Sequence, residues 1–448
     1  MATGFPRLRL VMRRELALDH RGLRNRGPLS RLCAHSALHC HYAELMRLFP
    51  VLLSSACLIA SCIPRKPSPA SNGGAATPAA TYAAMPLPPD APVAIHQVSE
   101  IEPPPVEAVS EPIPGFMRGI NLGNALDATQ EGAWGVTLDE KHFEMAKAAG
   151  LDHIRLPVRF NAHAKDQAPY TIEEAFFKRV DWAIDQATKR GLSIIIDLHH
   201  YEELMKKPAQ HAERVVGLWK QVAERYKNRP ASVAFELINE PCNELKSALL
   251  NPIQQRAIAA IRATNPTRLI IANSYFWAGA DYLKELELPA DPNVIASFHD
   301  YQPILFTHQG MPFMPAEFQT RGIVFPGPPA VPVTAVEAGQ KFDWVTSWIN
   351  SYNSQPIATN SNGPNAIFDY FKVVEAYIKS SKRRVYLGEF GVTDNADPKS
   401  REVWLRIVRQ EAEKRKIGWA LWDDGGKFRA MNITLGTWVA PIHAGLFE

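Results

Sequence analysis

The sequence lacks what a disulfide scaffold or a polytopic membrane protein requires. Of its five cysteines, four precede residue 63, and Cys242 alone lies in the remainder of the chain. The downstream part therefore cannot close an internal disulfide, whatever the redox state of its compartment. Apolar runs are short as well, because none reaches the roughly 18–20 residues that cross a bilayer.

An excess of charge of one sign is also missing. The 49 basic and 46 acidic residues leave a net charge of +3, and residues 1–45 alone carry +5 through eight arginines. The rest of the chain is therefore at −2. A body with this balance has no electrostatic attraction for a polyanion, so we expect no nucleic-acid partner.

Residues 46–62 have the layout of an export signal. A basic residue, Arg47, precedes an apolar stretch from Leu48 to Ala60 and small residues before Cys62, as in secretory signals. The residues around Cys62 also resemble a lipobox, which predicts a lipid on this cysteine; an ordinary signal peptide is the alternative. Because a signal belongs at the start of a chain, we interpret residues 1–45 as a mis-assigned extension before Met46.

A spacer is predicted between this signal and the folded domain. Residues 63–114 hold 13 of the 36 prolines and few large apolar residues, so this segment cannot bury enough surface to fold. Ile63 rather than Asp follows Cys62, which favours the outer membrane or cell surface; a periplasmic or secreted protein is the alternative. A lipid on Cys62 would be the only contact with a membrane.

From residue 115 to residue 448, short β-rich runs alternate with helical patterns. Several runs are almost continuously apolar, as in parallel strands covered on both faces. The runs are Phe116–Asn121, His153–Leu156, Ser193–Leu198, Val233–Ile238, Arg268–Ala272, Ile295–Phe298, Val385–Leu387 and Gly418–Leu421. Eight such units predict one α/β domain, a (β/α)8 barrel. An open doubly wound sheet is the alternative, but residues 119–123 lack the GxGxxG spacing that it favours after its first strand.

Two helices carry start and stop signals in the sequence. Thr137 and Thr171 each precede a glutamate by three residues, Glu140 and Glu174 respectively, which is the spacing of a capping box. Gly150 and Gly191 follow these helices as stop signals. With these threonines as N-caps, the sequence predicts helices that begin directly after Thr137 and Thr171 and end before Gly150 and Gly191.

Polar residues gather where the predicted strands end, which is where barrels carry their chemistry. Glu240 follows the fourth strand and Glu389 the seventh. A pair of carboxylic acids is what glycoside hydrolysis requires, and a separation of three crossovers lets the two face each other across the barrel mouth. Asp197 and Glu236 are rival acids. Glu236 alternates with Glu240 along the strand and is expected to be structural. Asp197 is expected either to pair with Arg155 or to cap the barrel layer.

His199 and His200 follow the third strand and suggest a metal pair. Neighbouring residues on a strand point to opposite faces, so we expect one of them to line the site. A dinuclear metal hydrolase is therefore the weaker interpretation, and we expect neither a metal nor another cofactor.

These residues lie in phrases that together resemble glycoside hydrolase family 5, the endoglucanase-type retaining enzymes. The phrases are RGINLGNALDA (118–128), HIRLPVRF (153–160), IIIDLHHYEEL (194–204), FELINEP (235–241), FHDYQPILFTHQG (298–310), YLGEFG (386–391) and WALWDDGG (419–426). The family's eight characteristic positions would fall on Arg155, His199, Asn239, Glu240, His299, Tyr301, Glu389 and Trp422. Asp300 and a Pro/Gly-rich insert at 311–336 depart from the pattern.

The resemblance implies roles for these residues. Glu389 would be the nucleophile and Glu240 the acid and then the base. Arg155 and Tyr301 would hold Glu389 ionised, and Asn239 would bind the sugar 2-hydroxyl. The remaining candidates for contact with substrate or with the two acids are His199, His299, Trp422, Asn124, Trp134 and Trp277. Packing in the core is the alternative for each tryptophan.

We therefore expect a monomeric enzyme that hydrolyses β-1,4-linked or mixed-linkage glucan with retention, most simply from within the chain. A β-mannanase or an exo-acting β-glucosidase on the same barrel is an alternative. So is a surface glycan-binding lipoprotein without activity, although the usual mark of such a protein, loss of one catalytic carboxylate, is missing here.

Overall fold

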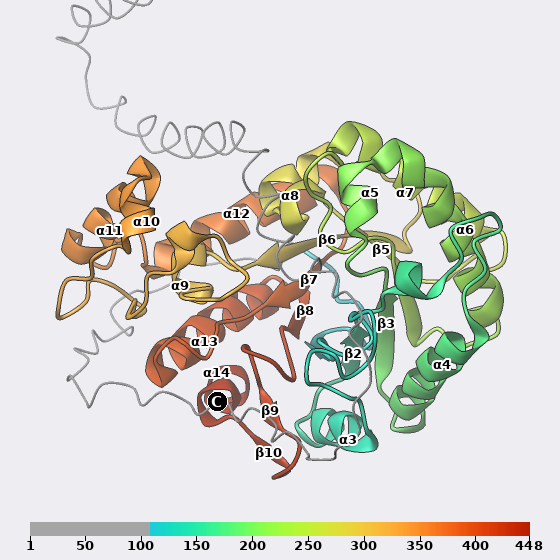
Figure 1. Cartoon of the computed structure of the whole chain (residues 1–448), viewed down its shortest axis with the longest axis horizontal. Helices are drawn as coiled ribbons and strands as arrows, with labels where there is room; N and C mark the ends of the chain where they lie inside the picture. Colours follow the sequence, from blue (N-terminus) through green and yellow to red (C-terminus); the bar gives the residue numbers. More distant parts are fainter. Residues whose placement is uncertain (1–107) are drawn as a thin grey trace, which may run out of the picture. The chain divides into compact units, whose positions relative to one another are not determined.

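The computed structural model of the protein describes residues 108–448, so the predicted extension, signal, Cys62 and most of the spacer lie outside the described residues. Within this range eight parallel strands close into a barrel in the order β1 to β8. Helices surround the strands (Figure 1). The predicted (β/α)8 barrel is thereby confirmed.

The barrel strands fall where the apolar runs predicted them, with ends that differ by a few residues. They are β1 (Arg118–Asn121), β2 (His153–Leu156), β3 (Ser193–Asp197), β4 (Val233–Glu236), β5 (Ile270–Asn273), β6 (Val294–Asp300), β7 (Val385–Phe390) and β8 (Gly418–Leu421). Two short strands, β9 (Met431–Asn432) and β10 (Thr437–Trp438), pair antiparallel near the C-terminus.

Helices and 3-10 turns occupy most of the intervals between the strands. They are α3 (Glu140–Ala148), η4 (Phe160–His163), α4 (Glu174–Lys189), α5 (Glu202–Lys206), α6 (Pro208–Tyr226), α7 (Ser247–Arg262), α8 (Tyr275–Ala278), η5 (Ala280–Glu285), α9 (Ile304–Thr307), η6 (Ala316–Phe318), α10 (Glu337–Gln340), α11 (Asp343–Ser354), α12 (Pro364–Ser381), α13 (Pro398–Lys414) and α14 (Ala440–Phe447). None of the helices in residues 108–448 is both long and apolar enough to cross a membrane.

Helices α3 and α4 end before Gly150 and Gly191 as predicted, but they start later than predicted and without the predicted caps. The N-cap of α3 is Asp139, whose side chain accepts from the Lys141 N–H and shares a capping box with His142. Glu173 precedes α4 without a side-chain cap. The threonines lie too far upstream of the first helical turn to reach its free N–H groups. Gly150 and Gly191 take left-handed backbone angles (φ 80° and 67°), which glycine tolerates best.

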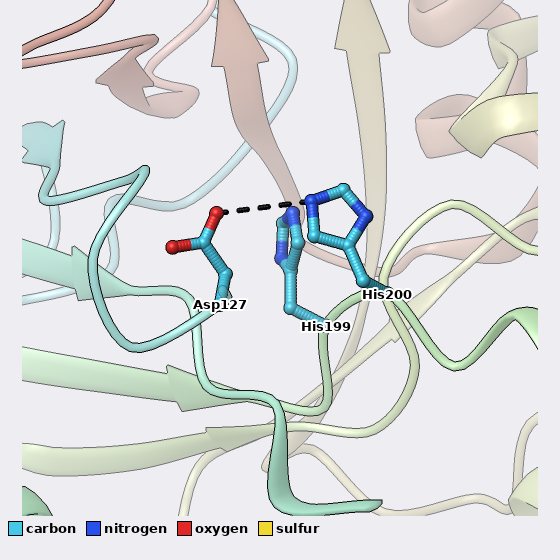
Figure 2. Close-up of side chains that lie close together, drawn as sticks. All are labelled: Asp127, His199 and His200. Carbon is cyan, nitrogen blue, oxygen red and sulfur yellow. Dashed lines mark ion pairs between the residues drawn. The ribbon is translucent and has the colours of Figure 1, made fainter. Parts of the chain in front are cut away.

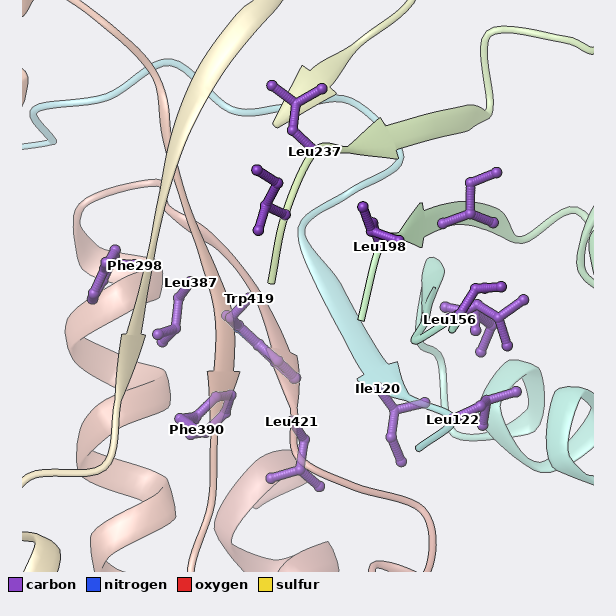
Figure 3. Close-up of a cluster of buried hydrophobic side chains, with 14 of the residues drawn as sticks. Ile120, Leu122, Leu156, Leu198, Leu237, Phe298, Leu387, Phe390, Trp419 and Leu421 are labelled. Carbon is purple, nitrogen blue, oxygen red and sulfur yellow. The ribbon is translucent and has the colours of Figure 1, made fainter. Parts of the chain in front are cut away.

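Strand side chains alternate between an outer and an inner core. Outward residues such as Phe298, Leu387 and Leu421 pack in the large cluster between barrel and helices (Figure 3). Inward residues, including Ile195, Ile271 and Tyr386, form a second cluster inside the barrel. Nearer the carboxyl ends of the strands the buried inward residues become polar, namely Asn121, Arg155, Asp197, Glu236, Asn273 and Ser297. This polar layer forms the floor of the site.

Candidate active site

Glu240 and Glu389 come together at the carboxyl end of the barrel, as the sequence predicted. Glu240 follows β4 and Glu389 lies within β7. One carboxylate oxygen of each, together with a ring nitrogen of His299, lies within 4.8 Å of the others. The Glu389 side chain is only 5% exposed, whereas that of Glu240 is 26% exposed, so Glu240 is the acid that solvent reaches more easily.

Two donors hold the Glu389 carboxylate. Arg155 Nη1 donates to Oε1 at 2.8 Å and the Tyr301 hydroxyl donates to Oε2 at 2.8 Å. Both contacts agree with the expected partners of Glu389. Because Arg155 is completely buried on β2, its charge acts on Glu389 with little screening by solvent.

Arg155 also contacts the two other acids at strand ends, Glu236 and Asp197. Glu236 accepts from Arg155 Nε and Nη2 at 2.8 and 2.7 Å, and Asp197 lies 2.9 Å from Nη2. The predicted pairing of Asp197 with Arg155 is confirmed, and Glu236 is fully enclosed, away from any substrate. Burial raises the pKa of Asp197 to about 8. Burial also acts to raise the pKa of Glu236, but the charge and hydrogen bonds of Arg155 outweigh it and lower that pKa.

Glu240 has a different set of neighbours. Its Oε1 lies 3.0 Å from His299 Nδ1, and its left-handed backbone (φ 45°) marks a turn directly after β4. Burial raises the pKa of Glu240 to about 7. Burial likewise raises the pKa of Glu389 to about 7, against the lowering effects of His299, Arg155 and Tyr301. Two acids this close resist being ionised together.

Asn239 and His199 link the polar layer to Trp422. Asn239 Oδ1 accepts from Arg155 Nη2 at 2.7 Å, and its Nδ2 lies 3.2 Å from His199 Nε2. The His199 ring is parallel to that of Trp422, with centroids 5.7 Å apart. Asn124 donates from its side chain to Asp423, the residue after Trp422. Asn239 and His199 are thus linked to Glu389 through Arg155, and His199 in turn contacts Trp422.

The expectation that His199 and His200 point to opposite faces is wrong. Strand β3 ends at Asp197, so strand alternation no longer applies, and His200 has a left-handed backbone (φ 52°). The two rings lie edge to face with centroids 4.5 Å apart, and Asp127 faces them (Figure 2). Asp127 Oδ2 lies 3.7 Å from His200 Nε2. Asp127 was not singled out from the sequence.

Asp127, His199 and His200 have the composition of a metal site, but most of their ligand atoms are engaged. His199 contacts Asp197 through Nδ1 at 3.1 Å and Asn239 through Nε2. The Asp127 oxygens accept the backbone N–H groups of Asn124 and Ala125 at 3.1 and 2.7 Å. A metal ion would have to displace these hydrogen bonds, so these residues do not fit a metal.

Two exposed aromatic rings flank the acids. Trp134 is 44% exposed, and its ring meets His200 edge to face. Phe313, in the insert at 311–336, is 56% exposed and contacts His308, whose ring in turn contacts Tyr301. Phe313 was missed because a single phenylalanine in a Pro/Gly-rich loop gives no pattern.

Two other residues singled out from the sequence are less exposed. Trp277 is half-buried and packs against the main core. Asp300 is buried, and its side chain accepts from the Gln302 N–H.

The comparisons with known proteins decide the family. A family model described as cellulase (glycosyl hydrolase family 5) matches residues 114–427. The chain belongs to this family. The resemblance inferred from the sequence is confirmed, and the protein is a glycoside hydrolase.

Relatives of this family 5 hydrolase include endoglucanases. Endoglucanase H of Acetivibrio thermocellus is 30% identical over 307 residues, which is 68% of this chain but 29% of that protein. Endoglucanase C of the same organism is 27% identical over 69% of this chain and 91% of its own length.

Solved structures agree with this family assignment. The cellulose synthase subunit Z of Clostridioides difficile is 36% identical, with a TM-score of 0.65, and the match covers 74% of this chain and all of that one. An endoglucanase of Thermotoga maritima is 35% identical, with a TM-score of 0.64, over 74% of this chain and 97% of its own. The Thermotoga enzyme has been solved with cellobiose and with mannotriose.

Proposed function

We propose that this family 5 hydrolase cleaves β-1,4-linked or mixed-linkage glucan within the chain, with retention of anomeric configuration. Glu389 is the nucleophile and Glu240 the general acid and base. The observation that carries the proposal is the approach of one oxygen of each carboxylate to within 4.8 Å of the other. Retaining enzymes keep their carboxyls about 5–5.5 Å apart, and inverting enzymes about 6.5–9.5 Å.

The surroundings of the two acids support this division of roles. Glu389 accepts from a buried arginine and a tyrosine hydroxyl, both of which favour its ionised form. Glu240 lies beside His299 instead. A single proton shared by the pair therefore resides on Glu240, which can deliver it to the leaving oxygen while Glu389 attacks the anomeric carbon.

The second half of the reaction uses the same residues in reverse. Having lost its proton to the leaving group, Glu240 takes one from the incoming water, which displaces Glu389 from the glycosyl-enzyme. The greater exposure of Glu240, 26% against 5%, suits an acid that must meet both the leaving group and water. Asn239, fixed by Arg155, is the candidate partner of the sugar 2-hydroxyl.

The retaining, metal-independent reaction is tested by following product anomers. NMR of the first product from mixed-linkage glucan should show the β-anomer, and an excess of chelator should leave the initial rate unchanged. A first-formed α-anomer would overturn the retaining mechanism. If chelator abolishes activity and a divalent ion restores it, the metal-independent mechanism is wrong.

The two exposed rings support cleavage within a chain. Trp134 lies on the side of β1 and β3, whereas Phe313 follows β6; in a closed ring of eight strands, β6 lies opposite β2. Sugar rings stack on aromatic faces, so platforms on both sides of the acids fit a substrate that extends in both directions.

Truncation of either ring should weaken polymer hydrolysis. We expect Trp134→Ala and Phe313→Ala each to lower kcat/KM on soluble glucan about 3- to 10-fold, since an aromatic contact contributes roughly 1 kcal/mol. Leu435→Ala is the matched control, because Leu435 is 71% exposed near the C-terminal hairpin. If the Phe313 variant keeps full activity on polymer, the open two-sided cleft is wrong.

A second candidate substrate is β-mannan, favoured by the mannotriose complex of the Thermotoga relative, which is 34% identical. Rates on glucan and mannan of equal chain length separate the two. An exported enzyme, lipid-anchored through Cys62, fits either substrate, because both polymers are too large to enter a cell.

A further inference from the structure

His299 uses only one of its two ring nitrogens on the acid. Nδ1 lies 3.0 Å from Glu240 Oε1. Nε2 is buried, and no hydrogen-bond partner for it is found among residues 108–448. A buried polar atom of this kind requires a partner, so the position of the imidazole proton depends on what lies beside Nε2.

Ser297 offers a partner from the same strand. Two residues before His299 on β6, it is fully buried, and its Oγ is likewise without a partner in the described part of the chain. Ala296 and Phe298, which alternate with these residues, pack in the outer core. Ser297 and His299 therefore share the inner face of the strand.

Gly388 packs closely against both polar atoms. The register of β6 with β7 shifts from Phe298–Leu387 to His299–Glu389, which leaves Gly388 as a bulge residue. A Cβ at this position would lie 2.8 Å from His299 Nε2 and 3.1 Å from Ser297 Oγ. Both atoms thus lie close to one point beside the Gly388 Cα, where there is too little room for a side chain at residue 388.

We propose that Ser297 is a positioning residue that fixes the tautomer of His299. Its hydroxyl, turned toward Nε2 by rotation about χ1 or bridged to it by one water, accepts the Nε2–H, so that Nδ1 is bare and accepts the proton of Glu240. This inference rests on the proposed acid and base role of Glu240. A bare Nδ1 keeps the proton on Glu240 in the first step and makes its carboxylate a stronger base in the second.

The charges around His299 are compatible with a neutral ring. Acidic groups on the strands or strand ends on either side act to raise the pKa of His299, and Arg155 acts to lower it. The acidic groups are Glu236 and Glu240 from β4 and the residues after it, Asp197 from β3 and Glu389 from β7. Tyr301 faces both catalytic acids from the end of β6. Burial lowers the pKa of His299, so the ring carries one proton at neutral pH.

Removal of the hydroxyl should change the pH profile. In Ser297→Ala the Nε2–H would be left unpaired, which is unfavourable for a buried donor. The Nε2–H tautomer is then disfavoured and the pKa of Glu240 falls. We expect the alkaline limb of kcat/KM to move down by about half a pH unit to one unit. Ser297→Thr keeps a hydroxyl, so the alkaline limb should lie at the wild-type pH. Ser193→Ala, which removes a buried hydroxyl from β3, should not move the alkaline limb.

A direct measurement separates this inference from the proposed function. In the ¹⁵N spectrum of the histidine-labelled wild-type protein without substrate, Nε2 of His299 should carry the proton and Nδ1 should be bare. A proton on Nδ1, or an unmoved alkaline limb in Ser297→Ala, would overturn the inference. Neither result affects glucan hydrolysis by the wild type, whose absence would instead overturn the proposed function.

Discussion

Replacement of Glu389 by alanine is expected to lower kcat by at least about 10⁴-fold on every substrate, because no glycosyl-enzyme can form without the nucleophile. Glu240→Ala should behave differently. It should lose about 10²- to 10⁴-fold on polymer, which needs acid assistance. On aryl glycosides with good leaving groups, it should still form the glycosyl-enzyme, which then accumulates because the base is missing.

Added azide distinguishes the two variants. A small anion needs no general base, so azide should restore turnover to Glu240→Ala and yield a β-glycosyl azide. Glu244→Ala is the matched control, because Glu244 follows the same strand but has a side chain that is 57% exposed. If azide rescues the Glu389 variant through a β-azide, the two acids have been assigned in reverse.

The second large effect concerns stability. Arg155→Met should lower the free energy of unfolding by about 3–5 kcal/mol, because Asp197, Glu236 and Glu389 lose the cation that they share in the buried layer. Guanidinium unfolding followed by circular dichroism measures this. The same substitution at Arg256, whose side chain is 45% exposed beside Glu213, should change little, since surface ion pairs contribute little.

An Arg155 variant as stable as the Arg256 variant would contradict this account. It would mean that the three acids are protonated or hydrated without the arginine. The polar layer would then not depend on a single cation, and the ionised state of Glu389 would need another explanation.

The barrel was predictable because its signals repeat. Eight apolar runs separated by amphipathic helices leave few arrangements, and each run coincides with a strand. Single strand ends were harder to predict. Strand β7 was expected to stop at Leu387 but continues to Phe390, because a bulge at Gly388 lets Glu389 pair with His299. A glycine in a strand suggests a bulge without identifying its register.

The site was predictable where a residue lies at or shortly after the end of a strand. Glu240, Glu389 and Tyr301 all lie at the carboxyl end of the barrel. Asp127 and Phe313 lie in loops, where position depends on contacts distant in sequence, so neither was found. The prediction for His200 failed because it assumed strand alternation beyond the last residue of β3, where the backbone is left-handed.

The central claim is that Glu389 forms a covalent bond with the sugar, and trapping tests it most directly. The wild-type enzyme is incubated with an activated 2-fluoro glycoside of cellobiose and digested, and its peptides are mapped by mass spectrometry. The account predicts one added fluoroglycosyl group on the peptide that contains Glu389. A label on Glu240 or Glu236, or active enzyme that turns over the reagent without ever carrying a label, would contradict it.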